Sequence, residues 1–234
     1  HHKKKLQVNT ESQKWQCWVC GAKGRSIYAL VKRTGVEERI LKAVENLVGK
    51  PVRSVIEKAY DTLSLPSEFI PFMNGNATDP DFKNAFHYLT VQRGITKYDI
   101  LKYNMGYCDK GLYAGMVIIP SYDANGQLNF FTGRTYYNDS SFKHKNPKVS
   151  KDIIGFDLFV NWNEPITIVE GAFDAIAVKR NAIPLFGKKM LNVLKSKIMN
   201  SQVSQVNIAL DTDAINDALE MCEYLISNGV EVRL

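Results

Sequence analysis

Three acidic residues in the last third of the sequence have the types and the spacing of metal ligands. Glu170 directly follows the apolar run Ile166–Val169, and about forty residues later Asp211 and Asp213 follow a second apolar run, Val206–Leu210. Side chains two positions apart on an extended segment point to the same side. One or two carboxylates together with substrate phosphates are the usual way in which a protein holds Mg²⁺. The sequence therefore predicts a divalent-cation site made by these three acids.

The segments around these acids alternate between strand and helix. Apolar runs end at Val169, Phe186 and Leu210, and the segments between them have helical spacing, as in Ala172–Arg180. This alternation predicts a parallel sheet over residues 165–234, with right-handed crossovers. The carboxyl ends of the strands then meet at one edge, where open α/β sheets usually bind ligands.

Each residue near this edge also has a structural alternative. Gly187 and Lys188 follow the second apolar run, so they could approach a phosphate or form an ordinary turn. Asp211 or Asp213 could cap the helix that follows, and Asp174 could complement the dipole of the helix before. These alternatives stay open for each acid alone, whereas the three acids in this order favour a metal site.

The pattern around the acids resembles a known fold. Hydrophobic-Glu-Gly-x-x-Asp-x-x-Ala at Glu170, followed by hydrophobic-Asp-x-Asp at Asp211, resembles the Toprim fold of bacterial and phage primases, type IA and II topoisomerases, and some nucleases and recombination proteins. The resemblance implies that Glu170 acts in catalysis and that Asp211 and Asp213 bind Mg²⁺ or Mn²⁺. Many primases have Asp-x-Asp-x-Ala-Gly, whereas this sequence reads DTDAINDA and lacks that glycine. This resemblance alone does not choose between a polymerase and a nuclease.

The composition is that of an ordinary globular protein with more basic than acidic residues. Of 234 residues, 45% are hydrophobic and 23% are charged, and the formal net charge is +6. A positive charge suits an anionic partner such as nucleic acid, but many basic proteins bind none. No apolar run is long enough to span a bilayer and no signal-like segment opens the sequence, so we expect no membrane partner and a cytoplasmic location in a bacterial cell or a phage-infected host. Because the sequence opens on HHKKK and stops on VEVRL, we expect a fragment that is cut at both ends.

Two cysteines near the N-terminus have the spacing of a zinc-ligand pair. Leu6–Val8 and Trp15–Trp18 read as the strands of a hairpin that leads into Cys17-x-x-Cys20-Gly21. Such a hairpin is half of a zinc ribbon, because the glycine turn lets two thiolates approach one tetrahedral metal ion. A redox pair is the alternative, but redox pairs usually open a helix in a thioredoxin-like unit.

This segment resembles the second half of the zinc-binding domain of DnaG-type primases, which ends in Trp/Tyr-x-Cys-x-x-Cys-Gly-x-x-Gly. The resemblance implies that Cys17 and Cys20 bind Zn²⁺ and that the other two ligands precede the first residue of this sequence. Trp15 and Trp18 supply aromatic faces on which the bases of a single-stranded template can stack. Alternatively, the two tryptophans pack a small core beside the metal.

The middle of the sequence reads as helices followed by a β-hairpin. Helical spacing dominates residues 26–70, including Val52–Tyr60, with LSLPSEFIPF as an extended segment and NGNATDPD as a loop, and two more helices are expected within Phe82–Tyr103. Met116–Pro120 and Gln127–Thr132 then read as two strands, because an Asn-Gly turn lies between them.

Basic residues gather after this hairpin, at Arg134 and in a polar loop that contains Lys145 and Lys148. Loops on a rigid scaffold often carry binding residues, so these side chains are candidates for phosphate contacts. The alternative is a solvated charged loop for the two lysines and a structural salt bridge for Arg134.

A second resemblance restricts the candidate Toprim families to the primases. The motifs Arg-Gly-Ile-Thr, Ile-Pro-x-x-Asp-x-x-Gly-x-x-x-x-Phe-x-x-Arg and Asn-Pro-x-x-x-Lys are similar to the N-terminal subdomain of the primase RNA-polymerase core, which precedes Toprim in that family. Topoisomerases and Toprim nucleases lack this subdomain. The resemblance implies that Arg134, and less directly Lys145 and Lys148, hold template and nucleotide phosphates.

Together the resemblances predict a multidomain α/β and α+β protein with four parts. These are a partial zinc-ribbon domain (1–25), a helical connector (26–80), the mixed α+β primase-core subdomain (81–164) and a C-terminally truncated Toprim domain, a parallel sheet with helices on both faces (165–234). They imply a DNA primase, a nucleotidyltransferase that makes short RNA primers on single-stranded DNA from ribonucleoside triphosphates, beside a fused or separate replicative helicase. Two alternatives remain: a Toprim-type nuclease or topoisomerase, and a non-catalytic nucleic-acid-binding module of a primase-helicase.

Overall fold

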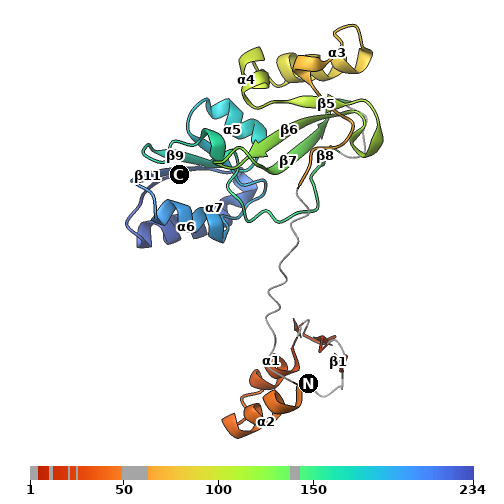
Figure 1. Ribbon diagram of the computed structural model, residues 1–234. Coiled ribbons are helices and arrows are strands. Elements are labelled where there is room, and N and C mark those ends of the chain that lie inside the picture. Colours follow the sequence, from red (N-terminus) through yellow and green to blue (C-terminus); the bar gives the residue numbers. More distant parts are fainter. Residues whose placement is uncertain (1–4, 11–12, 21, 25, 49–62, 138–142) are drawn as a thin grey trace. The chain divides into compact units, whose positions relative to one another are not determined.

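The computed structural model describes the 234 residues apart from 1–4, 11–12, 21, 25, 49–62 and 138–142. The chain divides into two compact units, His1–Asp61 and Thr62–Leu234, and Figure 1 labels their helices and strands. Within the described ranges, no helix has both the length and the apolar composition that a membrane crossing requires.

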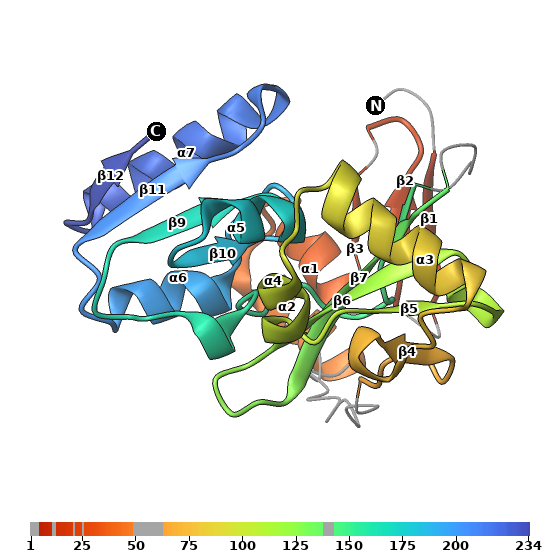
Figure 2. The same cartoon turned by 90° about the horizontal axis from the view of Figure 1, so that it is seen from above.

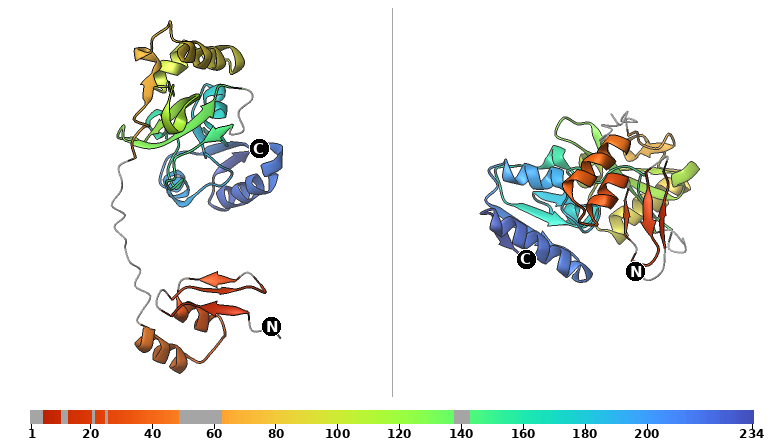
Figure 3. Two further views of the ribbon diagram at one scale, coloured as in Figure 1. Left: turned by 90° about the vertical axis from the view of Figure 1, so that its right-hand side faces the viewer. Right: turned by 90° about the horizontal axis from the view of Figure 1, so that it is seen from below.

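The N-terminal unit is a three-stranded antiparallel sheet followed by two helices. Their bounds are β1 Leu6–Val8, β2 Trp15–Cys17, β3 Lys23–Gly24, α1 Ile27–Lys32 and α2 Glu38–Val48. The predicted hairpin of β1 and β2 is confirmed, whereas β3 pairs with β2 as a strand that we did not predict. The left view of Figure 3 shows the three strands side by side. The predicted helix over Val52–Tyr60 lies outside the described residues.

Trp15 forms the centre of this small unit. Its side chain is buried, and its indole N–H donates a hydrogen bond to the carbonyl of Ser26 at 3.0 Å. A Cβ atom on Gly24 would lie 2.6 Å from the indole ring, so a glycine is required at that point of β3. Ser26 also caps α1, because its hydroxyl accepts from the Ala29 N–H. One tryptophan thus joins the sheet to the first helix.

The C-terminal unit begins with a five-stranded antiparallel sheet, in the order β4-β5-β6-β7-β8. Its strands are β4 Phe69–Pro71, β5 Gly106–Cys108, β6 Met116–Tyr122, β7 Leu128–Thr135 and β8 His144–Lys145, and its helical segments are η1 Phe72–Asn74, α3 Pro80–His87, η2 Tyr88–Gln92, α4 Lys97–Lys102 and η3 Gly111–Tyr113. The predicted hairpin is β6–β7, and at its turn the Asp123 carboxylate accepts from the Asn125 and Gln127 N–H groups. β8 lies in the segment that we predicted to be a loop, and it pairs with β7.

A four-stranded parallel sheet follows, in the order β10-β9-β11-β12. The elements are η4 Asp157–Phe159, β9 Ile166–Val169, α5 Ala172–Val178, β10 Ala182–Pro184, α6 Asn192–Met199, β11 Gln205–Ala209, η5 Thr212–Ala214, α7 Ile215–Ser227 and β12 Glu231–Arg233. Helix α5 covers one face of the sheet, and α6 and α7 cover the other (Figures 1 and 2). The predicted strand and helix alternation and the predicted mixed fold class are confirmed.

One hydrophobic core joins the two sheets of the C-terminal unit. Side chains of β6, β7 and α5 belong to the same buried cluster, and the ring of Phe130 on β7 lies 4.5 Å from the ring of Phe186, measured between centroids. Phe186 follows β10, so this contact fixes the carboxyl end of β10 against the antiparallel sheet. Helices α6 and α7 pack on the far face of the parallel sheet in a second cluster.

An ion pair reinforces this junction. The buried Asp99 carboxylate of α4 accepts from the Lys179 ammonium at the end of α5, and it also accepts from Thr96 in the capping box of α4. Burial alone would raise the pKa of Asp99, but the hydrogen bonds from Lys179 and Thr96 outweigh it and lower that pKa. The pair therefore stabilises the fold at neutral pH, and its contribution is lost as the pH falls through the pKa of the folded protein.

We expect Asp99→Ala to lower the free energy of unfolding by about 2 kcal/mol at pH 7, because the Thr96 N–H loses its acceptor in the capping box of α4 and Lys179 loses its partner. Urea denaturation monitored by circular dichroism measures the change, and the deficit should shrink below the pKa of Asp99. Asp109→Ala, at an exposed position, is the control and should change stability by less than about 0.5 kcal/mol. Equal losses in the two variants would contradict the role of this pair.

Candidate metal centre

Glu170 stands at the carboxyl end of the inner strand β9. The strand is an almost entirely buried apolar run, as expected where helices cover both faces of a parallel sheet. The chain then turns at Gly171 into α5, and the Asp174 carboxylate accepts from the Gly171 N–H at 3.1 Å. Asp174 therefore stabilises the start of α5, whereas Glu170 extends from the strand end.

Asp211 and Asp213 follow the neighbouring strand β11. Val169 of β9 lies opposite Ala209 of β11, so the acids after the two strands come close, and the Asp211 N–H donates to Glu170 Oε1 at 3.2 Å. From β9 the chain crosses through α5 on one face of the sheet, and from β11 it crosses through α7 on the other (Figure 2). Neighbouring strands with divergent connections form a topological switch point, the place where open α/β sheets bind ligands.

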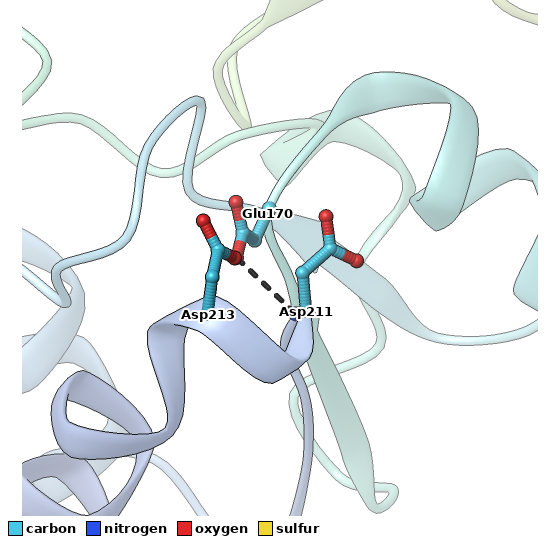
Figure 4. Close-up of side chains that lie close together, drawn as sticks. All are labelled: Glu170, Asp211 and Asp213. Atoms are coloured by element: carbon cyan, nitrogen blue, oxygen red, sulfur yellow. Dashed lines mark hydrogen bonds between the residues drawn. The ribbon is translucent and has the colours of Figure 1, made fainter.

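The three predicted acids are brought together at this point. Glu170, Asp211 and Asp213 each offer an oxygen atom, and these oxygens all lie within 4.8 Å of one another. Figure 4 shows the three side chains extending to the same side of the strand ends. Among the described residues, no other group of three or more acids, cysteines or histidines has this spacing. A set of carboxylate oxygens suits a hard cation such as Mg²⁺ or Mn²⁺.

The charges at this edge perturb one another. Burial, together with the negative charges of Asp211 and Asp213, raises the pKa of Glu170, and the Asp211 N–H and the Lys188 ammonium oppose this effect. Lys188 Nζ lies 2.6 Å from Asp213 Oδ2, which lowers the pKa of Asp213 and raises that of Lys188. The residue predicted to approach phosphate thus pairs here with one of the predicted metal ligands.

Arg134 and Lys145 lie on opposite faces of the antiparallel sheet. Arg134 lies opposite Val117, whose side chain belongs to the core that joins the two sheets, so Arg134 is on the face toward the parallel sheet. On β8, His144 lies opposite Arg134 and Lys145 lies opposite Gly133. Because neighbouring residues of a strand point to opposite faces, Lys145 is on the face away from the parallel sheet. Its ammonium donates to the Leu112 carbonyl at 2.9 Å and lies 5.2 Å from the centre of the Tyr113 ring. The structure does not bring Lys145 together with Arg134.

Two further lysines belong to the predicted basic loop. Lys148 is exposed, and its side chain has no ion pair or hydrogen bond with another residue that the structure describes. Lys151, which we did not predict as a site residue, donates to the Phe186 carbonyl, and a Cβ atom on Gly187 would lie 3.9 Å from its ammonium. Lys151 thus reaches the loop that carries Lys188. No sequence pattern links these positions, because the contact forms only when the two sheets pack.

The cysteine pair lies in the N-terminal unit. Cys17 is buried at the end of β2 and Cys20 is exposed. Hydrogen bonds from the backbone N–H groups of Cys20 and Val19 lower the pKa of Cys17 and favour the thiolate, the form that binds zinc. Two thiolates are half of the ligands of a tetrahedral zinc site, and no third ligand lies with them among the described residues.

The two tryptophans differ in exposure. Trp15 is buried against Gly24, so its position fits the packing alternative. Trp18 is 61% exposed, and its indole N–H donates to Gln7 Oε1 at 2.8 Å, which orients the ring at the surface. Trp18 is therefore the tryptophan that can stack on a nucleic-acid base.

The sequence comparisons give little information about function. No family model matches this sequence. An uncharacterized protein of Mycoplasma genitalium, MG010, is 26% identical over an alignment of 166 residues, and the alignment covers 66% of this chain and 74% of that protein.

Solved primase structures share the fold. The zinc-binding and RNA polymerase domains of the Aquifex aeolicus primase match 97% of this chain and 68% of that chain, with a TM-score of 0.55 and 18% identity. A DnaG primase catalytic domain bound to single-stranded DNA matches 66% of this chain and 63% of that chain (TM-score 0.55, 17% identity), and the E. coli primase catalytic core matches 67% and 66% (TM-score 0.53, 18% identity). This chain spans about two thirds of the length of these structures. The predicted resemblance to DnaG-type primases is confirmed for the fold.

We expect Glu170→Gln to stabilise the metal-free protein, because a carboxyl group with a raised pKa destabilises the fold once it is ionised. In EDTA at pH 7 the melting temperature should rise by no more than about 3 °C, and in acid, where Glu170 is protonated, the difference should vanish. Mg²⁺ should raise the melting temperature of the wild type more than that of the variant. Glu220→Gln, an exposed acid of α7, is the control, and an effect of the same size there would contradict the assignment.

Proposed function

We propose that this chain is the catalytic part of a DnaG-type DNA primase, which synthesises short RNA primers on single-stranded DNA from ribonucleoside triphosphates during replication. The observation that carries the proposal is the group Glu170, Asp211 and Asp213, gathered at the switch point of a sheet in a primase fold. The likeness to a DnaG catalytic domain bound to single-stranded DNA supports a template of this kind. A fused or separate replicative helicase is the expected partner.

Asp211 and Asp213 would hold Mg²⁺ or Mn²⁺, together with Glu170. When bound, the cation supplies charge neutralisation for the triphosphate and the leaving pyrophosphate. Burial raises the pKa of Glu170 above its ordinary value, which suits a group that accepts a hydrogen bond from the primer 3′-hydroxyl. The other side chains of the site would position the template and the nucleotide, since phosphoryl transfer needs little covalent chemistry from the protein.

Cationic and aromatic side chains would hold the substrates. Arg134 is on the face of the antiparallel sheet toward the parallel sheet, and we assign it to phosphate binding. Lys148 is exposed and keeps the same proposed role, whereas the position of Lys145 on the far face favours a structural one. Exposed Trp18 would stack on a template base.

Cys17 and Cys20 would bind Zn²⁺ with two further ligands. The support is the thiolate-favouring geometry of Cys17 and the match of nearly the whole chain to a primase structure that includes a zinc-binding domain. A structural zinc ion would stabilise the N-terminal unit, whose own apolar core is small.

The test of the reaction is incorporation of labelled ribonucleotides on single-stranded DNA by the full-length protein with Mg²⁺. Glu170→Gln and Asp211→Asn should each reduce primer synthesis by at least about 100-fold, because each removes a charge that acts on the reacting groups. Glu220→Gln, an isosteric change outside the triad, should retain activity.

Other outcomes would change the assignment. Shortening or nicking of the DNA that depends on Mg²⁺ and on the same acids, without RNA synthesis, would indicate a Toprim-type nuclease or topoisomerase. Binding of single-stranded DNA without either product would indicate a non-catalytic module of a primase-helicase.

Zinc content provides an independent test. Elemental mass spectrometry should detect zinc in the full-length protein. Cys17→Ser or Cys20→Ser should lose most of this zinc, because each variant removes one ligand of a tetrahedral site. Cys222→Ser, at a half-buried position on α7, should keep the zinc. Protein without zinc, or zinc that persists in both ligand variants, would contradict the proposed site.

A further inference from the structure

Lys188 forms the closest ion pair of the candidate metal centre. Its ammonium lies 2.6 Å from Asp213 Oδ2, and among the described residues no other lysine or arginine forms an ion pair with one of the three acids. Both partners are accessible, since the side chain of Lys188 is 40% exposed and that of Asp213 is 72% exposed. The pair can therefore open without unpacking the core.

The backbone around Lys188 is held in place, whereas its side chain can move. Phe186 and Met190, on either side of the loop, are buried, and Lys151 donates to the Phe186 carbonyl. A lysine has a long flexible stem and three donors on a compact charge. Its ammonium can therefore move from Asp213 to another anion at the same edge without movement of the loop.

The ion pair and a bound cation compete for the Asp213 carboxylate. Asp213 offers one of the oxygens that lie within 4.8 Å of those of Glu170 and Asp211. A divalent cation at this point repels the Lys188 ammonium, since both are positive and both seek the Asp213 carboxylate. A nucleotide phosphate, in contrast, attracts the ammonium that the cation has displaced.

We propose that Lys188 is the exchangeable counter-ion of this centre. It neutralises Asp213 while the cation is absent, releases Asp213 to the cation, and then binds a phosphate of the incoming nucleotide. The inference rests on the proposed function of the triad and adds a coupling to it. Because phosphate removes the competitor of the cation, cation and nucleotide favour the binding of each other, and this coupling is reciprocal.

The coupling predicts opposite effects of one substitution. Lys188→Gln should bind Mn²⁺ alone about two- to five-fold more tightly than the wild type, because an exposed ion pair no longer has to open. The same variant should bind Mg-ATP roughly five-fold more weakly, because the phosphate loses a charged donor. Lys188→Arg, which keeps the charge, should bind Mn²⁺ nearly as the wild type does.

The experiment is a Mn²⁺ titration of the full-length protein followed by electron paramagnetic resonance, together with calorimetric titration of Mg-ATP. Lys189→Gln is the matched control, because the neighbouring Lys189 pairs with Asp217 at 3.8 Å outside the triad, and both affinities should stay unchanged. If Lys188→Gln leaves the affinity for Mn²⁺ unchanged, or lowers the affinity for both Mn²⁺ and Mg-ATP, the proposed exchange of Lys188 is overturned while the metal site stands. If Asp211→Asn does not weaken Mn²⁺ binding, both the proposed centre and the exchange are overturned.

Discussion

Repulsion among three carboxylates is the constraint on which the candidate site depends. The order of the parallel strands places Glu170 beside Asp211 and Asp213, with oxygens within 4.8 Å of one another. The Asp211 N–H and the Lys188 ammonium offset part of this repulsion, and burial together with the remaining negative charge raises the pKa of Glu170. The feature that destabilises the metal-free protein is thus the feature that gives affinity for a divalent cation.

Such an edge keeps its geometry only if the fold behind it is rigid. The junction of the two sheets provides this rigidity through the contact of Phe130 with Phe186 and through the core side chains of β6, β7 and α5. The pair of Asp99 and Lys179 closes the same junction at the end of α5. Because close-packed cores resist deformation, we expect the loop after β10 and the strand ends to keep their positions when ligands bind.

The alternation of strands and helices in the parallel sheet and the acidic group could be predicted from the sequence, because both follow from local patterns. Apolar runs, helical spacing and the rule for parallel crossovers place Glu170 and Asp211 at one edge without knowledge of the packing. The face of Lys145 could not be predicted, since it depends on a one-residue register in the two-residue strand β8. The contacts of Lys188 and Lys151 could not be predicted either, because they join segments that meet only in the tertiary structure.

The acids alone do not choose between joining and cutting nucleic acid, since both reactions need a cation beside a phosphate. The difference lies in how much phosphate charge the site must hold. A nuclease holds one phosphodiester at the cation, whereas a polymerase holds a triphosphate and the strand to which it is joined. Lys188 pairs with Asp213, Lys151 donates to the loop that carries Lys188, and Arg134 is on the face of the antiparallel sheet toward the parallel sheet. Positively charged side chains of this kind suit the proposed synthesis of RNA, because a triphosphate carries more negative charge than one phosphodiester.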